Sequence, residues 1–82
     1  MLRALAHPDR RRFVVACRAG PRAAGDLAEL SQLSLATVSE HLKVLRKSGL
    51  LILDKRGRFW FYGTDLGVLQ RAEVAIRELS EG

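Results

Sequence analysis

The chain of 82 residues has a single cysteine, two prolines and no long apolar segment. With Cys17 alone it can form neither an internal disulfide nor a cysteine-rich zinc site, and this favours a reducing compartment. No apolar run approaches the roughly 18 residues of a membrane span, and Met1 is followed by polar and charged residues rather than by a signal peptide. We therefore expect a cytoplasmic protein with no membrane partner.

Acidic residues are scarce relative to basic ones. Lys and Arg number 14 against 9 Asp and Glu, which gives a formal charge of +5. Such a balance favours a polyanion or an anionic surface as partner, although many basic proteins bind neither. The sequence also lacks a nucleophile and base pair, a carboxylate pair and a phosphate-cradling glycine loop. We expect no catalytic residues, no cofactor and no enzymatic activity.

Residues 34–48 form the clearest single pattern, an amphipathic helix. Ser34 suits its N-cap, and Gly49 can take the left-handed conformation that ends a helix. Val38 and Leu42 belong to a stripe with helical period, completed by Leu45, that predicts a buried face. The opposite face has small polar side chains that suit a DNA groove, then cations that suit phosphates. The residues expected at DNA are Ser34, Ala36, Thr37, Ser39, Glu40, Lys43, Arg46 and Lys47.

An apolar and a charged face are typical of any surface helix, so the elements on either side decide the interpretation. Upstream, Pro8 suits the first turn of a helix over residues 8–19, and a shorter helix is predicted over residues 24–30. A tight turn at residues 31–33 then leads into the amphipathic helix, which completes a helix-turn-helix. The side chains expected to face inward from the two upstream helices are Phe13, Val14, Val15, Cys17, Leu27 and Leu30.

Three successive arginines begin at Arg10. Because successive helical residues turn by about 100°, the three fan through about 200° and cannot all face one ligand. We expect Arg10 to orient nearby loops or carboxylates, whereas Arg11 and Arg12 are either weak phosphate contacts or solvated. His41 follows the buried stripe and is expected to pack or hydrogen-bond, and His7 either caps the next helix or is exposed.

Downstream of Gly49, residues 51–62 read as two strands around a glycine turn, which predicts a β-hairpin. Lys55, Arg56 and Arg58 surround its tip and suit phosphates or a neighbouring minor groove, as in the wing of a winged helix-turn-helix. A charged, solvated turn is the alternative. The nearby aromatics also suggest a base-stacking platform for single strands, but a two-stranded hairpin must bury one face, so we expect Trp60 and Tyr62 in the core.

The chain closes with a helix predicted over residues 65–80 and opens with a short helical piece over residues 2–6. Leucines and isoleucine recur along the last helix at helical spacing, so it either packs against a second copy or folds back on its own core. The whole pattern predicts a single domain over residues 1–82, mainly α with a β-hairpin.

Three segments together resemble the ArsR/SmtB-type repressors. They are residues 2–10, the Ser39 to Arg46 stretch and the hairpin over residues 55–62. The resemblance covers almost the whole chain and implies a homodimer that binds an operator in double-stranded DNA and represses until an inducer releases it. It also implies that the first and last helices form the dimer interface. The interface residues expected on this ground are Leu2, Leu5, Leu66, Leu69, Ile76 and Leu79.

The chain departs from the metal sensors that the resemblance brings to mind. Their Cys-x-Cys pair falls here at Ala23 and Gly25, and residues 65–82 contain neither His nor Cys. Because thiophilic metals, zinc and nickel need several thiolate or imidazole ligands at short spacing, we expect no metal site and treat Cys17 and the two histidines as scattered. Cys17 lacks a second cysteine in its own subunit, so a packed, inert thiol is favoured over a redox switch.

The sequence thus predicts a sequence-specific DNA-binding repressor with an inverted-repeat operator and an unknown inducer. The alternative is a winged-helix module that binds another protein and has no operator specificity. The positive charge and the basic hairpin favour DNA.

Overall fold

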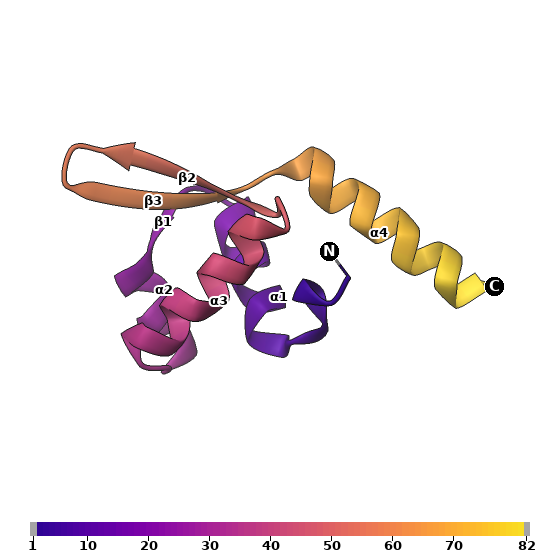
Figure 1. Ribbon diagram of the computed structural model, residues 1–82, viewed down its shortest axis with the longest axis horizontal. Coiled ribbons are helices and arrows are strands. Elements are labelled where there is room, and N and C mark those ends of the chain that lie inside the picture. The colour runs from indigo at the N-terminus through magenta and orange to yellow at the C-terminus, as the bar shows by residue number, and fades with distance from the viewer. Residues whose placement is uncertain (1, 82) are drawn as a thin grey trace.

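The computed structural model describes residues 2–81, and its elements follow one another as a bundle of short helices, a hairpin and a terminal helix (Figure 1). The three strands form one antiparallel sheet in the order β1-β3-β2. The elements are η1 (Ala4–Ala6, a 3₁₀ turn), α1 (Pro8–Arg18), β1 (Arg22–Ala23), α2 (Ala24–Ser31), α3 (Leu35–Lys47), β2 (Leu51–Arg56), β3 (Phe59–Thr64) and α4 (Leu66–Glu81). This is the winged helix-turn-helix arrangement that the sequence predicts.

The core lies beneath α3. Its stripe of Val38, Leu42 and Leu45 is fully buried, and it packs with Phe13 of α1 and Leu27 of α2 in one cluster. Burying side chains of this size stabilises the fold by about 1.5–3 kcal/mol each. The other buried members of the cluster are Ala4, Leu5, Val14, Cys17, Leu50, Leu51, Tyr62, Leu69 and Ala72.

The end of α3 fixes where the hairpin begins. Gly49 has φ +83°, a left-handed conformation that glycine adopts without the penalty of a Cβ. Its N–H donates to Arg46 O at 3.0 Å, and the N–H of Leu50 donates to Leu45 O at 3.1 Å. The N–H of Asp65 then donates to Leu50 O at 2.9 Å, so the return from β3 is tied to the same point. The helix, the hairpin and α4 therefore meet at one junction.

The sheet has a core face and an outer face. Leu51 pairs with Thr64 and Leu53 with Tyr62, and because paired residues project to the same side, these four lie on the core face. Thr64 anchors the sheet to α1, since its Oγ1 donates to Val14 O at 2.7 Å.

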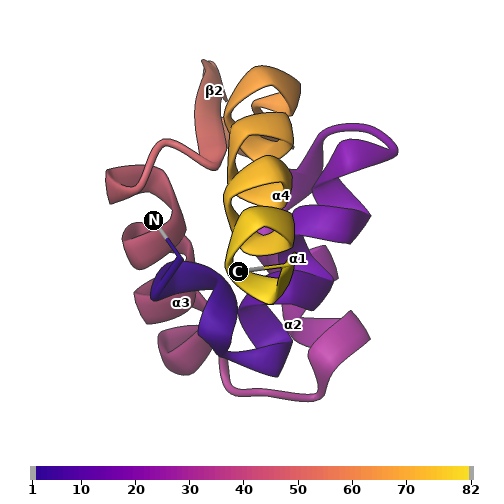
Figure 2. The same ribbon diagram turned by 90° about the vertical axis from the view of Figure 1, so that its right-hand side faces the viewer.

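α4 extends away from the rest of the fold, and the molecule measures 45 × 23 × 20 Å (Figure 1). Figure 2, which views the molecule from the α4 end, shows α4 in front of η1 and α1. Among residues 66–80 of this helix, only Leu69 and Ala72 are buried. Within residues 2–81, no helix combines the length and apolar character that crossing a bilayer requires.

Several boundaries differ from those predicted. The opening piece is a 3₁₀ turn of three residues rather than a helix over residues 2–6, and the hairpin continues to Thr64. The pairing of Arg22 with Tyr62 and of Ala23 with Phe61 adds a third strand that the sequence does not predict. A two-residue strand has no periodicity of its own, so only the partner strand reveals it.

Three side chains expected in the core are exposed. Val15 projects from the side of α1 opposite Phe13, because two residues on a helix differ by about 200°. Leu30 lies in the last turn of α2, beside an open hollow rather than under α3. Trp60 lies on the core face of the hairpin but beyond the point where the helices cover it, so it is half exposed whereas Tyr62 is buried.

Replacing Gly49 by Ala is expected to lower the free energy of unfolding by about 1–2 kcal/mol. The strain is in the backbone, because the added methyl would meet only Val68 Cγ2 at 3.9 Å. Thermal unfolding followed by circular dichroism measures this loss of stability, since the melting temperature of a domain of this size falls by about 4–8 °C per kcal/mol. Gly25→Ala, in open space on α2, is the control and should cause no loss. Equal melting temperatures for the wild type and Gly49→Ala would show that this backbone conformation is not required.

Candidate nucleic-acid interface

α3 begins at a side-chain cap. Ser34 Oγ accepts a hydrogen bond from the N–H of Thr37 at 3.2 Å and donates to Thr37 Oγ1 at 2.9 Å. Because the cap satisfies a free N–H group of the first turn, the helix starts where the sequence predicts. The hydroxyl groups of Ser34 and Thr37 are thus ordered at the exposed end of the helix.

The two faces of α3 are separated as expected. Its buried side chains are Val38, His41, Leu42 and Leu45. All the residues predicted to meet DNA are exposed, namely Ser34, Ala36, Thr37, Ser39, Glu40, Lys43, Arg46 and Lys47. A 13-residue helix with an uncovered face of small, polar and cationic side chains has the dimensions and chemistry of a major-groove reader.

A hydrogen bond between side chains fastens α3 to α1. Arg10 Nε donates to His41 Nδ1 at 3.1 Å. Arg10 therefore orients α3, the predicted recognition helix, through a histidine rather than orienting a loop or a carboxylate. His7 stacks beside His41 with ring centroids 4.4 Å apart, and Phe13 lies behind it at 6.2 Å. Burial lowers the pKa of His41 below its usual value, and the neighbouring His7 and Arg10 charges lower it further, against the opposing effect of Asp9.

The three successive arginines of α1, which begin at Arg10, each have a different partner. Arg11 donates to Leu5 O at 2.9 Å and to Ala6 O at 3.3 Å, which ties η1 to α1. Arg12 lies 3.4 Å from a carboxylate oxygen of Asp9. The expectation that they cannot share one ligand is confirmed, and the structure gives Arg11 and Arg12 intramolecular contacts rather than a common basic face.

The hairpin brings its cations to a tip beyond the core. Gly57 has φ +61°, which the turn between Arg56 and Phe59 requires. Lys55, Arg56 and Arg58 are all exposed. Arg56 Nε donates to Asp54 Oδ2 at 2.9 Å. Lys55 Nζ lies over the ring of Trp60, 4.4 Å from its centroid.

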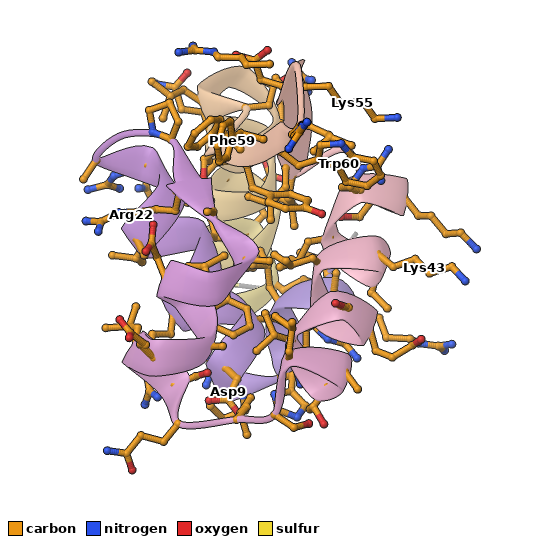
Figure 3. The ribbon with its side chains drawn as sticks, turned by 90° about the vertical axis from the view of Figure 1, so that its left-hand side faces the viewer. Asp9, Arg22, Lys43, Lys55, Phe59 and Trp60 are labelled. Atoms are coloured by element: carbon orange, nitrogen blue, oxygen red, sulfur yellow. The ribbon has the colours of Figure 1, made fainter. Side chains whose placement is uncertain are left out.

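Figure 3 relates the hairpin to the recognition helix. Lys43, Lys55 and Trp60 lie on one side of the molecule, and Arg22 and Phe59 lie toward the other. Lys43 of α3 and Lys55 of the hairpin therefore share one side of the molecule. We use the name α3–hairpin surface for the exposed residues of α3 named above together with Lys55, Arg56 and Arg58 at the hairpin tip. Trp60 lies beside Lys55, next to this surface. The sequence did not predict its exposure, because an aromatic residue in a short hairpin is expected to be buried.

His7, Asp9 and His41 come together although the sequence suggested that the histidines are scattered. One potential ligand atom from each lies within 4.8 Å of the others. Their hydrogen bonds favour a structural role, because His7 Nδ1 accepts the N–H of Asp9 at 3.2 Å and His41 Nδ1 accepts from Arg10. An imidazole that binds a metal through one ring nitrogen normally donates the N–H of the other. Here Nδ1 of both histidines accepts a hydrogen bond, so a bound cation would have to displace the donors, which include the Arg10 guanidinium.

Cys17 is buried in the core cluster. Burial raises the pKa of its thiol to about 11, despite the opposing charge of Arg22. Since the thiolate is the reactive form, the geometry favours the packed, inert thiol over the redox switch.

Three of the predicted interface residues, Leu5, Leu69 and Ile76, line a groove between α1 and α4. Leu5 and Leu69 are buried in its floor, and Ile76 and Val15 reach its rim. Leu66 and Leu79 of α4 are exposed, and Leu2 is partly exposed. The groove has a volume of about 360 Å³ and is mostly apolar. Of the predicted interface residues on α4, the chain itself covers Leu69 and leaves Leu66, Ile76 and Leu79 exposed.

Comparison with known proteins gives a consistent result. Residues 5–54 match the helix-turn-helix domain family. The chain is 30% identical over 70 residues to the transcriptional repressor SdpR of Bacillus subtilis, covering 85% of this chain and 78% of SdpR. It is 40% identical over 76 residues to the HTH-type transcriptional regulator NmtR of Mycobacterium tuberculosis, covering 92% of this chain but 63% of NmtR.

A solved structure shares both fold and sequence. The crystal structure described as a possible transcriptional regulator for arsenical resistance superposes with a TM-score of 0.88 and 32% identity, over 95% of this chain and 81% of that one. The correspondence thus includes α4 and the hairpin as well as the helix-turn-helix.

The burial of His41, which lowers its pKa, predicts a pH dependence of stability. The pKa of His41 is lower in the folded chain than the unfolded value of about 6.5, so below that pH the unfolded chain binds more protons. This contribution is complete above about pH 6.5 and is lost as the pH falls toward the folded pKa. Urea unfolding between pH 8 and pH 5 should show the loss in the wild type.

The His41→Gln variant is the matched control, because its amide oxygen can accept from Arg10 but does not titrate. It should lose less stability than the wild type over the same range. Identical pH profiles for the two proteins would contradict this account of His41.

Proposed function

The chain belongs to the ArsR/SmtB-type family of winged helix-turn-helix transcriptional regulators, and on this premise we propose that it is a homodimeric repressor of an inverted-repeat operator. The observation that carries the proposal is the α3–hairpin surface, whose small polar and cationic residues are all exposed and whose Lys43 and Lys55 lie on the same side of the molecule. SdpR, which is described as a repressor, supports the direction of regulation.

In this proposal the start of α3 enters the major groove and reads base edges. The side chains assigned to bases are Ala36, Thr37, Ser39 and Glu40. A short exposed hydroxyl or methyl lets the helix approach closely, and a carboxylate such as Glu40 accepts from cytosine N4. Ser34 contributes mainly as the cap that orders this end.

Phosphate contacts fall to the cations that follow. Lys43, Arg46 and Lys47 continue along the exposed side of α3, and Lys55, Arg56 and Arg58 extend the positive surface onto the hairpin. Such contacts set the register and orientation of a protein on DNA and supply much of its affinity. Neither set requires a metal, a cofactor or a catalytic step, and the protein would act in the cytoplasm.

The second copy is proposed to cover the groove between α1 and α4. The exposed fractions of Leu66, Ile76 and Leu79 are 56%, 43% and 70%, and an exposed apolar row of this kind is typical of a protein–protein interface. A second α4 related by a two-fold axis would bury the row with the proposed interface residues Leu2, Leu5 and Leu69. Two α3 helices would then lie about 34 Å apart, in successive major grooves.

Operator binding should depend steeply on salt. The experiment first recovers genomic fragments retained by the purified protein and then measures their affinity by gel shift with competitor DNA. If a dimer neutralises about six to eight phosphates, log affinity falls with log salt at a slope of about −5 to −7. No competitor-resistant band, together with a stable complex with another protein, would favour the protein-interaction module instead.

Lys43→Ala should reduce the magnitude of that slope by about 2, because each dimer loses two phosphate contacts. Arg22→Ala is the matched control, since Arg22 is also exposed and lies away from Lys43 (Figure 3). It should leave the slope within about 1 of the wild type. An equal effect of the two substitutions would place DNA elsewhere on the protein.

Leu79→Asp should convert the dimer to a monomer in sedimentation velocity, because a carboxylate buried against an apolar face carries a large desolvation cost. Leu30→Asp is the control, since Leu30 is 52% exposed but lies on α2, outside the groove. It should leave the dimer intact. A wild-type protein that sediments as a monomer at micromolar concentration would contradict the homodimer.

A further inference from the structure

The core face of the hairpin continues outward past the end of the core. Leu53 pairs with Tyr62, and two residues farther along Lys55 pairs with Trp60, so all four project to the same side. Tyr62 is buried, whereas Trp60 is 47% exposed because no helix covers this part of the face. The face that packs on the core thus ends in a tryptophan and a lysine that are open to solvent.

Lys55 and Trp60 contact each other on that face. The ammonium nitrogen of Lys55 lies 4.4 Å from the centroid of the indole ring, within the range of a cation–π interaction. A flexible lysine is thereby held against one side of the strand instead of sampling its many rotamers.

The neighbouring hairpin cation, Arg56, also lies over an aromatic ring, that of Phe61 at 5.7 Å, but unlike Lys55 it has a carboxylate partner. Arg56 pairs with Phe59 across the strands and lies on the opposite face, where its guanidinium is 2.9 Å from Asp54 Oδ2. That carboxylate offsets its charge. Within residues 2–81, Lys55 has an aromatic ring as its neighbour but no carboxylate in ion-pair distance.

We propose that Trp60 is a positioning residue for DNA binding, and that its ring holds the Lys55 ammonium on the α3 side of the hairpin for contact with a DNA phosphate. The inference rests on the proposed function and adds to it a residue that the α3–hairpin surface does not include. Figure 3 shows Lys55, Trp60 and Lys43 on the same side of the molecule.

The arrangement works because the ring attracts the cation without neutralising it. A carboxylate partner, such as Asp54 for Arg56, must be separated from its cation or share it when a phosphate arrives. An indole face carries no net charge, so the ammonium can contact ring and phosphate together. Trp60 thus reduces the entropy lost by Lys55 on binding, and the full charge of Lys55 stays available.

The test is a double-mutant cycle. The DNA is the genomic fragment that the wild-type protein retains, and the affinity of each variant for it is measured by gel shift at low salt. An exposed cation–π contact corresponds to about 2–5-fold in affinity, so Trp60→Ala should weaken a dimer with two wings by about 5–20-fold. In the Lys55→Met background, which keeps the aliphatic stem and removes the charge, the same change should cost less than about 2-fold. Trp60→Phe should retain most of the affinity.

Phe59→Ala is the matched control, because Phe59 is 68% exposed and lies on the outer face of the same strand. It should change affinity less than about 2-fold. Thermal unfolding of each variant separates loss of fold from loss of positioning. If Trp60→Ala does not fold, Trp60→Leu, which keeps apolar bulk but has no ring, is compared in the two Lys55 backgrounds instead.

Two results overturn the inference and leave the proposed function intact. Either removal of the Trp60 ring reduces the affinity equally with and without the Lys55 charge, or removal of the ring does not reduce the affinity at all. In both, the wild type still retains its specific fragment. A wild type that retains no fragment overturns the proposed function and this inference with it.

Discussion

The burial of one side of α3 is the constraint on which the rest of the structure depends. Val38, Leu42 and Leu45 are removed from water almost completely, so the helix cannot rotate without exposing them. The Arg10–His41 hydrogen bond fixes the same helix to α1 at its polar edge. Because the helix has one possible rotation, Ser39 and Lys43 must face outward. The buried side of α3 thus determines which of its residues form the exposed surface proposed to bind DNA.

The hairpin is positioned by the same helix. The left-handed Gly49 ends α3 and sends the chain into β2, and the hydrogen bond from Asp65 to Leu50 O returns the chain from β3 to the same junction. As a result, the cations of α3 and of the hairpin are held on one body rather than on two mobile parts. In the proposed complex with DNA, this rigidity limits the entropy lost on binding.

Sequence reasoning found the features with a strong local signal. Ser34 and Gly49 mark the ends of α3 through capping chemistry, and the spacing of its buried residues is periodic enough to give its orientation. It failed where the outcome depends on how far the covering elements reach. Trp60 and Tyr62 are two residues apart and lie on the same face of β3. The helices cover Tyr62 but leave Trp60 half exposed. The pairing of Ala23 with Phe61 and the approach of His7 to His41 join segments far apart in the chain, which no local pattern reveals. The DNA contacts themselves stay predictions.

The central claim is that α3 reads a major groove and the hairpin meets the adjacent backbone. Footprinting of the recovered operator tests it most directly, with dimethyl sulfate for the major groove and hydroxyl radicals for the backbone. The account predicts protection of guanine N7 in two sites about one helical turn apart, on one face of the duplex, with backbone protection beside each. Unprotected major-groove guanines in a complex of full affinity would contradict it.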